Sequence, residues 1–161
     1  MHDTTLQRSL TVFLRVAIGW TFLYAGVTQV FDPSWSAAGF LTHTKTFHFL
    51  FAGFAAPGVL PVTNVLVSWG HLLIGLSLVF GVLTRLGGTF GALLMLVYWL
   101  AHMDFPYVDS PLNFLIDDHV VYAAALVYLM TRHAGQIAGL DGWLGGLAFV
   151  RSHPALRPLV A

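Results

Sequence analysis

Histidines and aspartates set among apolar residues are the side chains of this 161-residue chain whose types and spacing could do chemistry. Asp117, Asp118 and His119 are consecutive, and neighbouring carboxylates with little water around them either repel each other or share a proton. His71 lies inside a long apolar run, where an ionisable group costs about 3 kcal/mol on membrane-insertion scales. Groups of these types transfer protons in enzymes. The candidate catalytic residues are therefore His71, Asp117, Asp118 and His119.

A second set consists of cationic or hydrogen-bonding side chains near the same ends of the apolar runs. It comprises His43, Lys45, His48, Tyr98 and His102. Such groups bind anions or the oxygens of a carbonyl compound, so we predict a role in substrate binding. Two structural alternatives stay open, because His71 could hydrogen-bond a neighbouring helix and His102 could lie at the membrane interface.

The composition is that of a membrane protein. Hydrophobic residues make up 57% of the chain and charged residues only 9%, which a soluble domain of this size does not tolerate. At roughly 20 residues per crossing there is room for about four spans. The net charge of zero, with seven Lys and Arg residues, argues against nucleic acid as a partner.

The absence of cysteine limits the redox chemistry that the chain can supply. It excludes disulfides, thiolate nucleophiles, iron–sulfur clusters and zinc sites built on cysteine. We assign no metal ligands and expect no covalent cofactor. Any electron transfer must use a bound substrate, a cofactor or a partner.

Four apolar runs predict an all-α integral membrane four-helix bundle in a single domain over residues 1–161. The expected spans are 10–31, 62–84, 86–102 and 112–131, with a tight turn at 84–88 between the second and third. The first loop contains the apolar stretch 47–54, too short to cross, which predicts an amphipathic or re-entrant segment. The Gly-rich tail, 132–161, is expected on the membrane surface.

Charge sets the expected orientation. Six arginines flank the same ends of the spans, whereas Lys45 is the lone basic residue of the opposite side. Basic residues are retained in the cytoplasm. The distribution therefore predicts a multi-pass protein of the inner (cytoplasmic) membrane with both termini in the cytoplasm.

Spacings of three and four place polar and small residues on one face of each span. The four faces are 15/19/22/26/29, 64/68/71/75, 91/95/98/102 and 113/117/121/124/128. A lipid-facing stripe would be uniformly apolar, so these faces are predicted to line the bundle interior. Together they predict a pocket that opens on the side opposite the arginines.

Short motifs resemble those of the DoxX/DoxD family of four-span membrane proteins. The first span carries an arginine and ends in an Ala-Gly step (residues 14–26), the second ends in Gly-x-x-Thr-Arg (81–85), and the tail contains Gly139-Leu140-Asp141. The resemblance covers roughly residues 10–144. Arg15 is expected to extend its side chain to the cytoplasmic headgroups.

The first loop, with Trp35 and residues 37–41, and the stretch 113–119 look most similar to the large subunit of thiosulfate:quinone oxidoreductase. That resemblance implies oxidation of thiosulfate to tetrathionate, quinone as the electron-accepting substrate, and a partner subunit or homo-oligomer in the lipid bilayer. Two alternatives remain. One is a non-catalytic accessory subunit of a larger respiratory membrane complex, and the other is a haem-binding electron-transfer subunit that uses His71 with His102 or His119.

Overall fold

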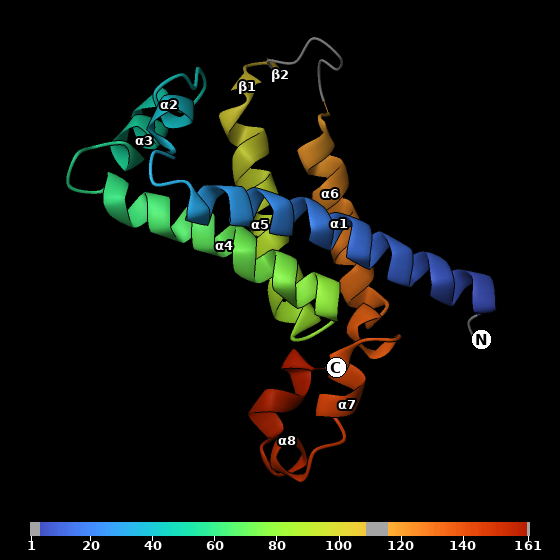
Figure 1. Ribbon diagram of the computed structural model, residues 1–161. Helices are drawn as coiled ribbons and strands as arrows, with labels where there is room; N and C mark the ends of the chain where they lie inside the picture. Colours follow the sequence, from blue (N-terminus) through green and yellow to red (C-terminus); the bar gives the residue numbers. More distant parts are fainter. Residues whose placement is uncertain (1–3, 109–115, 161) are drawn as a thin grey trace.

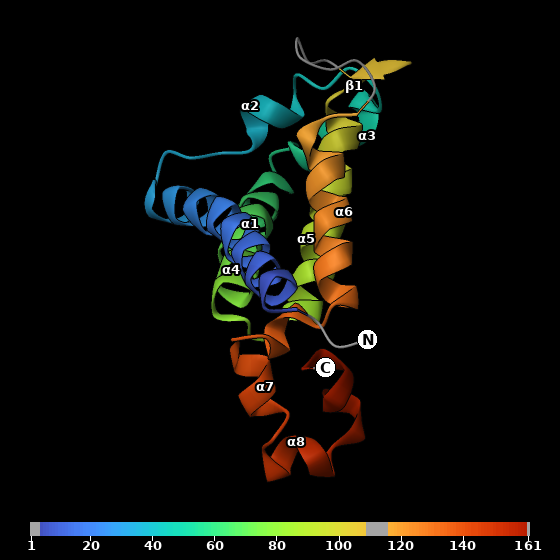
Figure 2. The same ribbon diagram turned by 90° about the vertical axis from the view of Figure 1, so that its right-hand side faces the viewer.

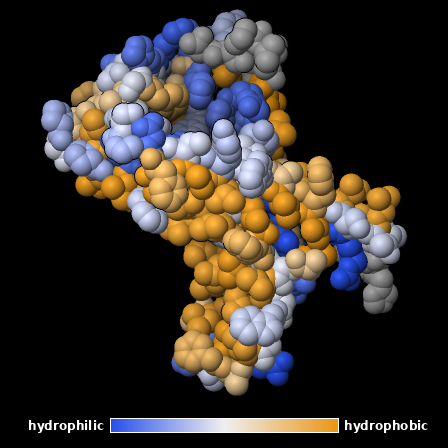
Figure 3. Space-filling view, viewed as in Figure 1, coloured by the Kyte–Doolittle hydropathy of each residue, from blue (hydrophilic) through white to orange (hydrophobic). Residues whose placement is uncertain are grey.

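The computed structural model describes residues 4–108 and 116–160 and is almost entirely helical. Three helices are long and apolar enough to cross a membrane: α1 (Thr5–Phe31), α4 (Leu60–Phe80) and α5 (Thr84–Ala101). A shorter apolar helix, α6 (Asp118–Thr131), follows them. Figure 3 shows hydrophobic side chains spread along the helices and hydrophilic ones mainly at the ends of the molecule. The protein is therefore a multi-pass helical membrane protein, as the composition predicted.

The helices associate as two pairs. Helix α1 packs along α4, helix α5 packs along α6, and α4 also contacts α5. Figures 1 and 2 show that the α1/α4 pair crosses the α5/α6 pair at a steep angle. The interior is therefore narrow where the pairs cross, and it holds the buried core residues Ile18, Phe22, Ile74, Leu78, Ala92, Met95, Ala123, Leu126, Leu129 and Ala134.

Glycines allow α1 and α4 to approach closely. A Cβ atom added at Gly26 would overlap the backbone of Leu72, and one added at Gly75 would overlap the backbone of Leu23. Small residues at such crossings let membrane helices pack backbone against backbone. Both glycines belong to the faces that the sequence predicted to lie inside the bundle, and both are buried.

Arg15 lies inside the protein and does not reach the membrane surface. Its side chain is 1% exposed. The guanidinium donates to the backbone oxygens of three residues that follow α6: Nη1 to Ala134 and, at 3.0 Å, to Ile137, and Nη2 to Ala138 at 3.1 Å. The expectation that Arg15 extends to the headgroups is therefore wrong, because backbone carbonyls just after α6 lie within its reach and accept from the buried guanidinium.

Asp141 is a buried, negatively charged residue near Arg15. Its carboxylate accepts hydrogen bonds from the amides of Leu83 at 2.6 Å and Thr84 at 2.9 Å, and its own amide donates to the oxygen of Gly81 at 2.8 Å. The carboxylate also attracts the Arg15 guanidinium electrostatically. One side chain from the C-terminal segment thus caps the first turn of α5.

Because of this capping, α5 begins earlier than predicted and the turn between α4 and α5 lies closer to the N-terminus of the chain. The sequence predicted the turn at residues 84–88, but those residues are helical and the connection consists of Gly81, Val82 and Leu83. Gly81 ends α4 in the left-handed conformation, with φ +65°. Gly87 and Gly88 serve close packing instead, since an added Cβ would meet Ser77 and Met130 respectively.

The fourth helix also differs from its predicted span. Residues 116 and 117 are not helical, and α6 begins at Asp118 with Asp117 as its N-cap. Its buried face is Ala123, Leu126 and Leu129, whereas Val121 and Tyr128 are exposed. The predicted interior face through 121, 124 and 128 is therefore wrong, because the capping residue was counted as part of the helix. Asn113 lies outside the described residues.

Short elements cover the end of the bundle where α1 stops and α4 starts. They are α2 (Ala38–Leu41), α3 (His48–Phe54), β1 (Met103–Asp104) and β2 (Tyr107–Val108). Leu41 and Phe51 bury their side chains against Ala101 at the end of α5. Lys45 pairs with Asp104 at 2.9 Å, which ties the first loop to the β1–β2 hairpin. The first loop therefore lies over the end of α5.

The C-terminal segment forms four short helices beyond the opposite end. These are η1 (Ala134–Gln136), α7 (Leu140–Leu144), α8 (Ala148–Ser152) and η2 (Pro154–Leu159). Figure 1 shows α7 and α8 below the helix pairs, near the α4–α5 turn. Trp143 and Phe149 are exposed there.

Replacing Gly75 with alanine should separate α1 from α4. The new methyl group overlaps the Leu23 backbone, so we expect a loss of roughly 1–3 kcal/mol of stability. Thermal unfolding in detergent measures it. Gly70→Ala is the matched control on the same helix, since its Cβ would meet nothing within 4 Å. Equal melting temperatures for the two variants would contradict the close crossing.

A double-mutant cycle tests the Arg15 and Asp141 pair. Removing either partner leaves a buried charge without compensation, so Arg15→Leu and Asp141→Ala should each cost roughly 3–5 kcal/mol. The double variant should cost clearly less than the sum, because the two charges act on each other. Arg8→Ala, at an exposed position of α1, is the control. Strictly additive losses would show that the two residues stabilise the fold independently.

Candidate functional site

Four rings from three helices form a continuous row at the end of the bundle beneath the first loop. His71 comes from the middle of α4, Tyr98 from the last turn of α5, His102 directly after α5, and His119 from the first turn of α6. Ring centroids lie 5.6 Å apart for His71–Tyr98, 5.6 Å for Tyr98–His119 and 4.9 Å for His119–His102. The steep crossing of the helix pairs is what brings α4 and α6 to the two sides of Tyr98.

His71 is held by two other helices. Its Nδ1 lies 2.9 Å from Oε1 of Gln29 on α1, and its Nε2 lies 3.3 Å from the hydroxyl of Tyr98. An amide oxygen only accepts, so Nδ1 donates to Gln29 and Nε2 accepts from Tyr98. Asn64 and Ser68 instead bond to the first loop and to their own helix. The side-chain partners of His71 are thus Gln29 and Tyr98, with Gln29 on a predicted interior face.

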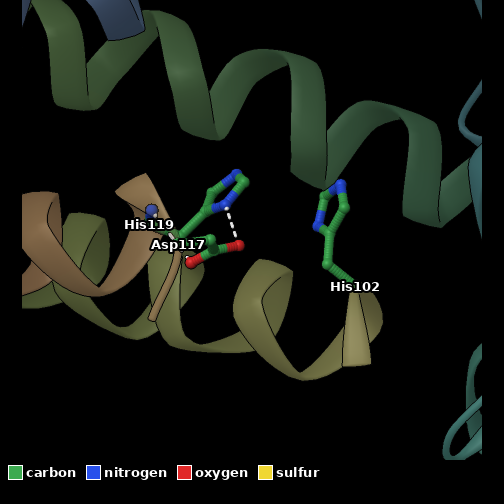
Figure 4. A group of neighbouring side chains, drawn as sticks. All are labelled: His102, Asp117 and His119. Carbon is green, nitrogen blue, oxygen red and sulfur yellow. Dashed lines mark hydrogen bonds and ion pairs between the residues drawn. The ribbon is translucent and has the colours of Figure 1, made fainter. Parts of the chain in front are cut away.

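Asp117 organises the start of α6. One carboxylate oxygen accepts from the amides of His119 at 3.1 Å and Val120 at 3.4 Å, and the other lies 2.9 Å from Nδ1 of His119. Figure 4 shows this contact and the His102 ring beside the pair. Asp117 therefore has two structural effects, because it caps the N-terminus of α6 and also orients the imidazole of His119. Asp118 is exposed, so the two aspartates have different surroundings.

Two cavities share Tyr98 and His119 in their walls. The first, of about 300 Å³, lies toward the first loop and is lined by Gln29, Trp35, Ser36, Ala37, Phe40, Leu41, Val67, Tyr98, His102 and His119. The second, of about 270 Å³, lies toward α1 and α6 and is lined by Thr21, Phe22, Ala25, His71, Met95, Tyr98, Asp118, His119 and Tyr122. We call them the loop-side cavity and the helix-side cavity. Aromatic and imidazole rings make up much of both.

A third, smaller cavity of about 170 Å³ lies next to the loop-side cavity. Phe40 and His102 line both, and His43, Thr44 and Lys45 complete the polar side of the smaller one. His48 is exposed, bonds to the backbone oxygen of Thr44 at 2.8 Å and lines none of the cavities described here. Of the predicted substrate-binding residues, all except His48 therefore line a cavity.

The motifs noticed in the sequence converge at the other end of the bundle. Arg15, the Gly81–Thr84 turn and Asp141 come from three distant segments and meet in one buried hydrogen-bonded region. A family model described as DoxX matches residues 10–103, more than half of the chain.

The chain belongs to the DoxX family. No curated protein and no solved structure matches it. The residues matched in this DoxX protein include Arg15 at the buried end as well as the cavity residues His71 and Tyr98.

One group of residues in this DoxX protein was not predicted from the sequence. A ring nitrogen of His102, a ring nitrogen of His119 and a carboxylate oxygen of Asp117 lie within 4.8 Å of one another, close enough to hold a metal ion. All three residues were predicted to be catalytic or substrate-binding, and none was predicted to be a metal ligand. Only the packing of α5 against α6 shows that residues 102 and 117–119 are neighbours.

Asp117→Ala should destabilise α6 and free the His119 side chain. Loss of an N-cap costs about 1 kcal/mol, whereas Asp117→Asn keeps an acceptor for the two amides and should lose less. Thermal unfolding followed by circular dichroism in detergent measures the difference. Asp118→Ala, at an exposed neighbouring position, is the control and should melt close to the wild type. A larger loss at Asp118 would contradict the capping assignment.

Proposed function

We propose that this DoxX protein is the quinone-interacting membrane subunit of a thiosulfate:quinone oxidoreductase-type system. The observation that carries the proposal is the loop-side cavity, whose volume is about 300 Å³ and whose wall combines aromatic rings with Tyr98, His102 and His119. Quinone sites need an apolar slot with one or two hydrogen-bonding groups near the quinone oxygens. This cavity offers both.

The quinone ring would lie in the loop-side cavity against the rings of Trp35, Phe40 and Tyr98, which all line it. Phe40 and Tyr98 already contact each other edge to face, with centroids 5.7 Å apart, which is the packing that an inserted aromatic ring would extend. His119 and Gln29 also line the cavity and can bond to the two quinone oxygens. His71 supports Tyr98 from behind through its hydrogen bond to the hydroxyl. It is a positioning residue in this assignment.

The smaller cavity suits the anionic electron donor. His43, Lys45 and His102 line it, and these are the side chains that bind oxyanions. Two thiosulfate ions lose one electron each as an S–S bond forms between them, and the quinone takes up both electrons with two protons from water. Because no side chain of this chain can itself hold electrons, a partner subunit or a second copy is expected to assist. His48 and Asp118 have no role here.

The arginine-bearing ends of the helices are assigned to the cytoplasm and the cavity end to the opposite side of the inner membrane. Arg8, Arg85 and Arg132 lie at the start of α1, the start of α5 and the end of α6, which share one end of the structure. Basic residues near span ends are retained in the cytoplasm. Both termini would then be cytoplasmic, and the donor would arrive from outside.

The packing does not favour haem. Tyr98 lies between His71 and His119, in ring contact with both, and so occupies the space between the two imidazoles. His119 and His102 stack on each other at 4.9 Å, which leaves no room for a porphyrin between them.

An accessory role in a larger respiratory complex is the second candidate. An apolar groove of about 510 Å³ runs along the outside of α4 and α5, lined by Trp69, Leu73, Phe90 and Leu93 among others. A helix of a partner subunit would bury these side chains, and so would lipid.

Binding of a short-chain ubiquinone analogue tests the quinone site. Trp35 lines the cavity, so the bound quinone should quench tryptophan fluorescence of the purified protein in detergent. Gln29→Leu and His119→Gln should each weaken binding by about tenfold, or ~1.4 kcal/mol, because these two side chains bond to the quinone oxygens. Tyr128→Phe, on the exposed face of α6, is the matched control. Identical quenching curves for all four proteins would exclude this cavity.

Thiosulfate-dependent quinone reduction separates the two candidate functions. An electron-transfer subunit should support reduction, alone or with its partner, and lose rate in His71→Ala and Asp117→Asn. A stoichiometric partner that co-purifies in a complex without thiosulfate activity would favour the accessory role. Unchanged rates in both variants would remove these two residues from the mechanism.

A further inference from the structure

We propose that His102, Asp117 and His119 form a binding site for one divalent transition-metal ion of the Zn²⁺/Fe²⁺ class. The three side chains come from the end of α5 and the start of α6, and Figure 4 shows them together. Their potential ligand atoms lie within 4.8 Å of one another. The site is a structural property of the chain and does not depend on whether the neighbouring cavity binds quinone.

The distance between the Asp117 and His119 ligand atoms is close to the distance between two neighbouring ligands of one metal ion. Two ligand atoms that are each about 2.1 Å from one ion lie roughly 3.0–3.4 Å apart. The Oδ2 of Asp117 and the Nδ1 of His119 are 2.9 Å apart. An ion would therefore replace the proton that these two atoms share, with little movement of either side chain.

His102 is oriented to supply the third ligand. Its Nδ1 lies 2.8 Å from the backbone oxygen of Tyr98, and a carbonyl only accepts, so the proton is on Nδ1 and the lone pair is on Nε2. A backbone carbonyl bonded to one ring nitrogen is the usual outer support of a metal-bound histidine. Within residues 4–108 and 116–160, Nε2 of His102 has no hydrogen-bond partner.

The chemical types of the three metal ligands indicate which class of ion would bind. Two imidazoles and a carboxylate suit Zn²⁺, Fe²⁺ and similar ions, whereas Mg²⁺ and Ca²⁺ prefer oxygen ligands and Cu⁺ prefers sulfur. Three protein ligands leave at least one coordination position open. His102 and His119 both line the loop-side cavity, so the open position would face that cavity. A small oxygen-bearing ligand could complete the shell there.

Cobalt binding by the purified full-length protein tests the site directly. The protein should carry a tag without histidine, be stripped with chelator in detergent and then be titrated with Co²⁺, whose visible absorption reports its ligands. We expect one Co²⁺ per chain, displaced by Zn²⁺. His102→Gln, His119→Gln and Asp117→Asn should each weaken binding by at least about tenfold. Asp117→Asn keeps a capping side chain, so the loss can be measured on a folded protein.

His153→Gln and Asp32→Asn are the matched controls, because both residues are exposed and neither belongs to the group of three ligands. Both should bind Co²⁺ as the wild type does. Absence of stoichiometric binding in the wild type, or equal binding in every variant, would overturn the metal site. Quinone quenching is measured on the same metal-free samples. Loss of Co²⁺ binding with normal quenching in Asp117→Asn would therefore leave the quinone site intact.

Discussion

The buried guanidinium of Arg15 is the interaction on which the rest of this fold depends. A fixed cation inside a membrane bundle is costly unless hydrogen bonds and opposite charge compensate it. Three carbonyls that follow α6 accept hydrogen bonds from the two Nη atoms, and the carboxylate of Asp141 supplies opposite charge. The consequence is that α1, the α4–α5 turn and the segment after α6 are tied together at one end. Every helix that crosses the core is connected to this region.

That connection explains how cavities can exist at the other end. The α1 and α4 helices meet at Gly26 and Gly75 with almost no side chain between them, and their pair crosses α5 and α6 steeply. The Gly26 contact lies directly beside His71, so the close packing of α1 on α4 fixes one wall of the helix-side cavity. The space is bordered by rings rather than aliphatic side chains, because His71, Tyr98 and His119 project from different helices toward one another. The hydrogen-bonded end with Arg15 and the cavity-bearing opposite end are two results of the same packing.

The sequence predicted the structure well wherever residue polarity or size repeats at helical spacing. The interior faces of α1 and α4 were read correctly from spacing alone, as the burial of Gly26, Ser68 and His71 confirms. The class of protein followed from composition in the same way. Family motifs were recognised, but their joint role was invisible, because Arg15 and Asp141 are 126 positions apart in the chain and meet only through folding.

Two predictions, the position of the α4–α5 turn and the interior face of α6, were wrong for the same reason, which is that a helix end was misplaced. Asp141 caps α5 from a distant segment and so moved the predicted turn, and Asp117 caps α6 and so shifted the predicted interior face. In both cases the prediction was based on the apolar residues next to the aspartate in the sequence. The hydrogen-bond partners of the carboxylate are backbone amides instead. Capping also changes how the Asp117–His119 pair should be understood. A carboxylate fixed by two amides offers its second oxygen in a defined direction, toward His119, with the His102 ring stacked beside it. The constraint that ends one helix therefore also aligns three ligand-bearing side chains, which is why chemistry in this protein is expected at a helix terminus rather than in mid-membrane.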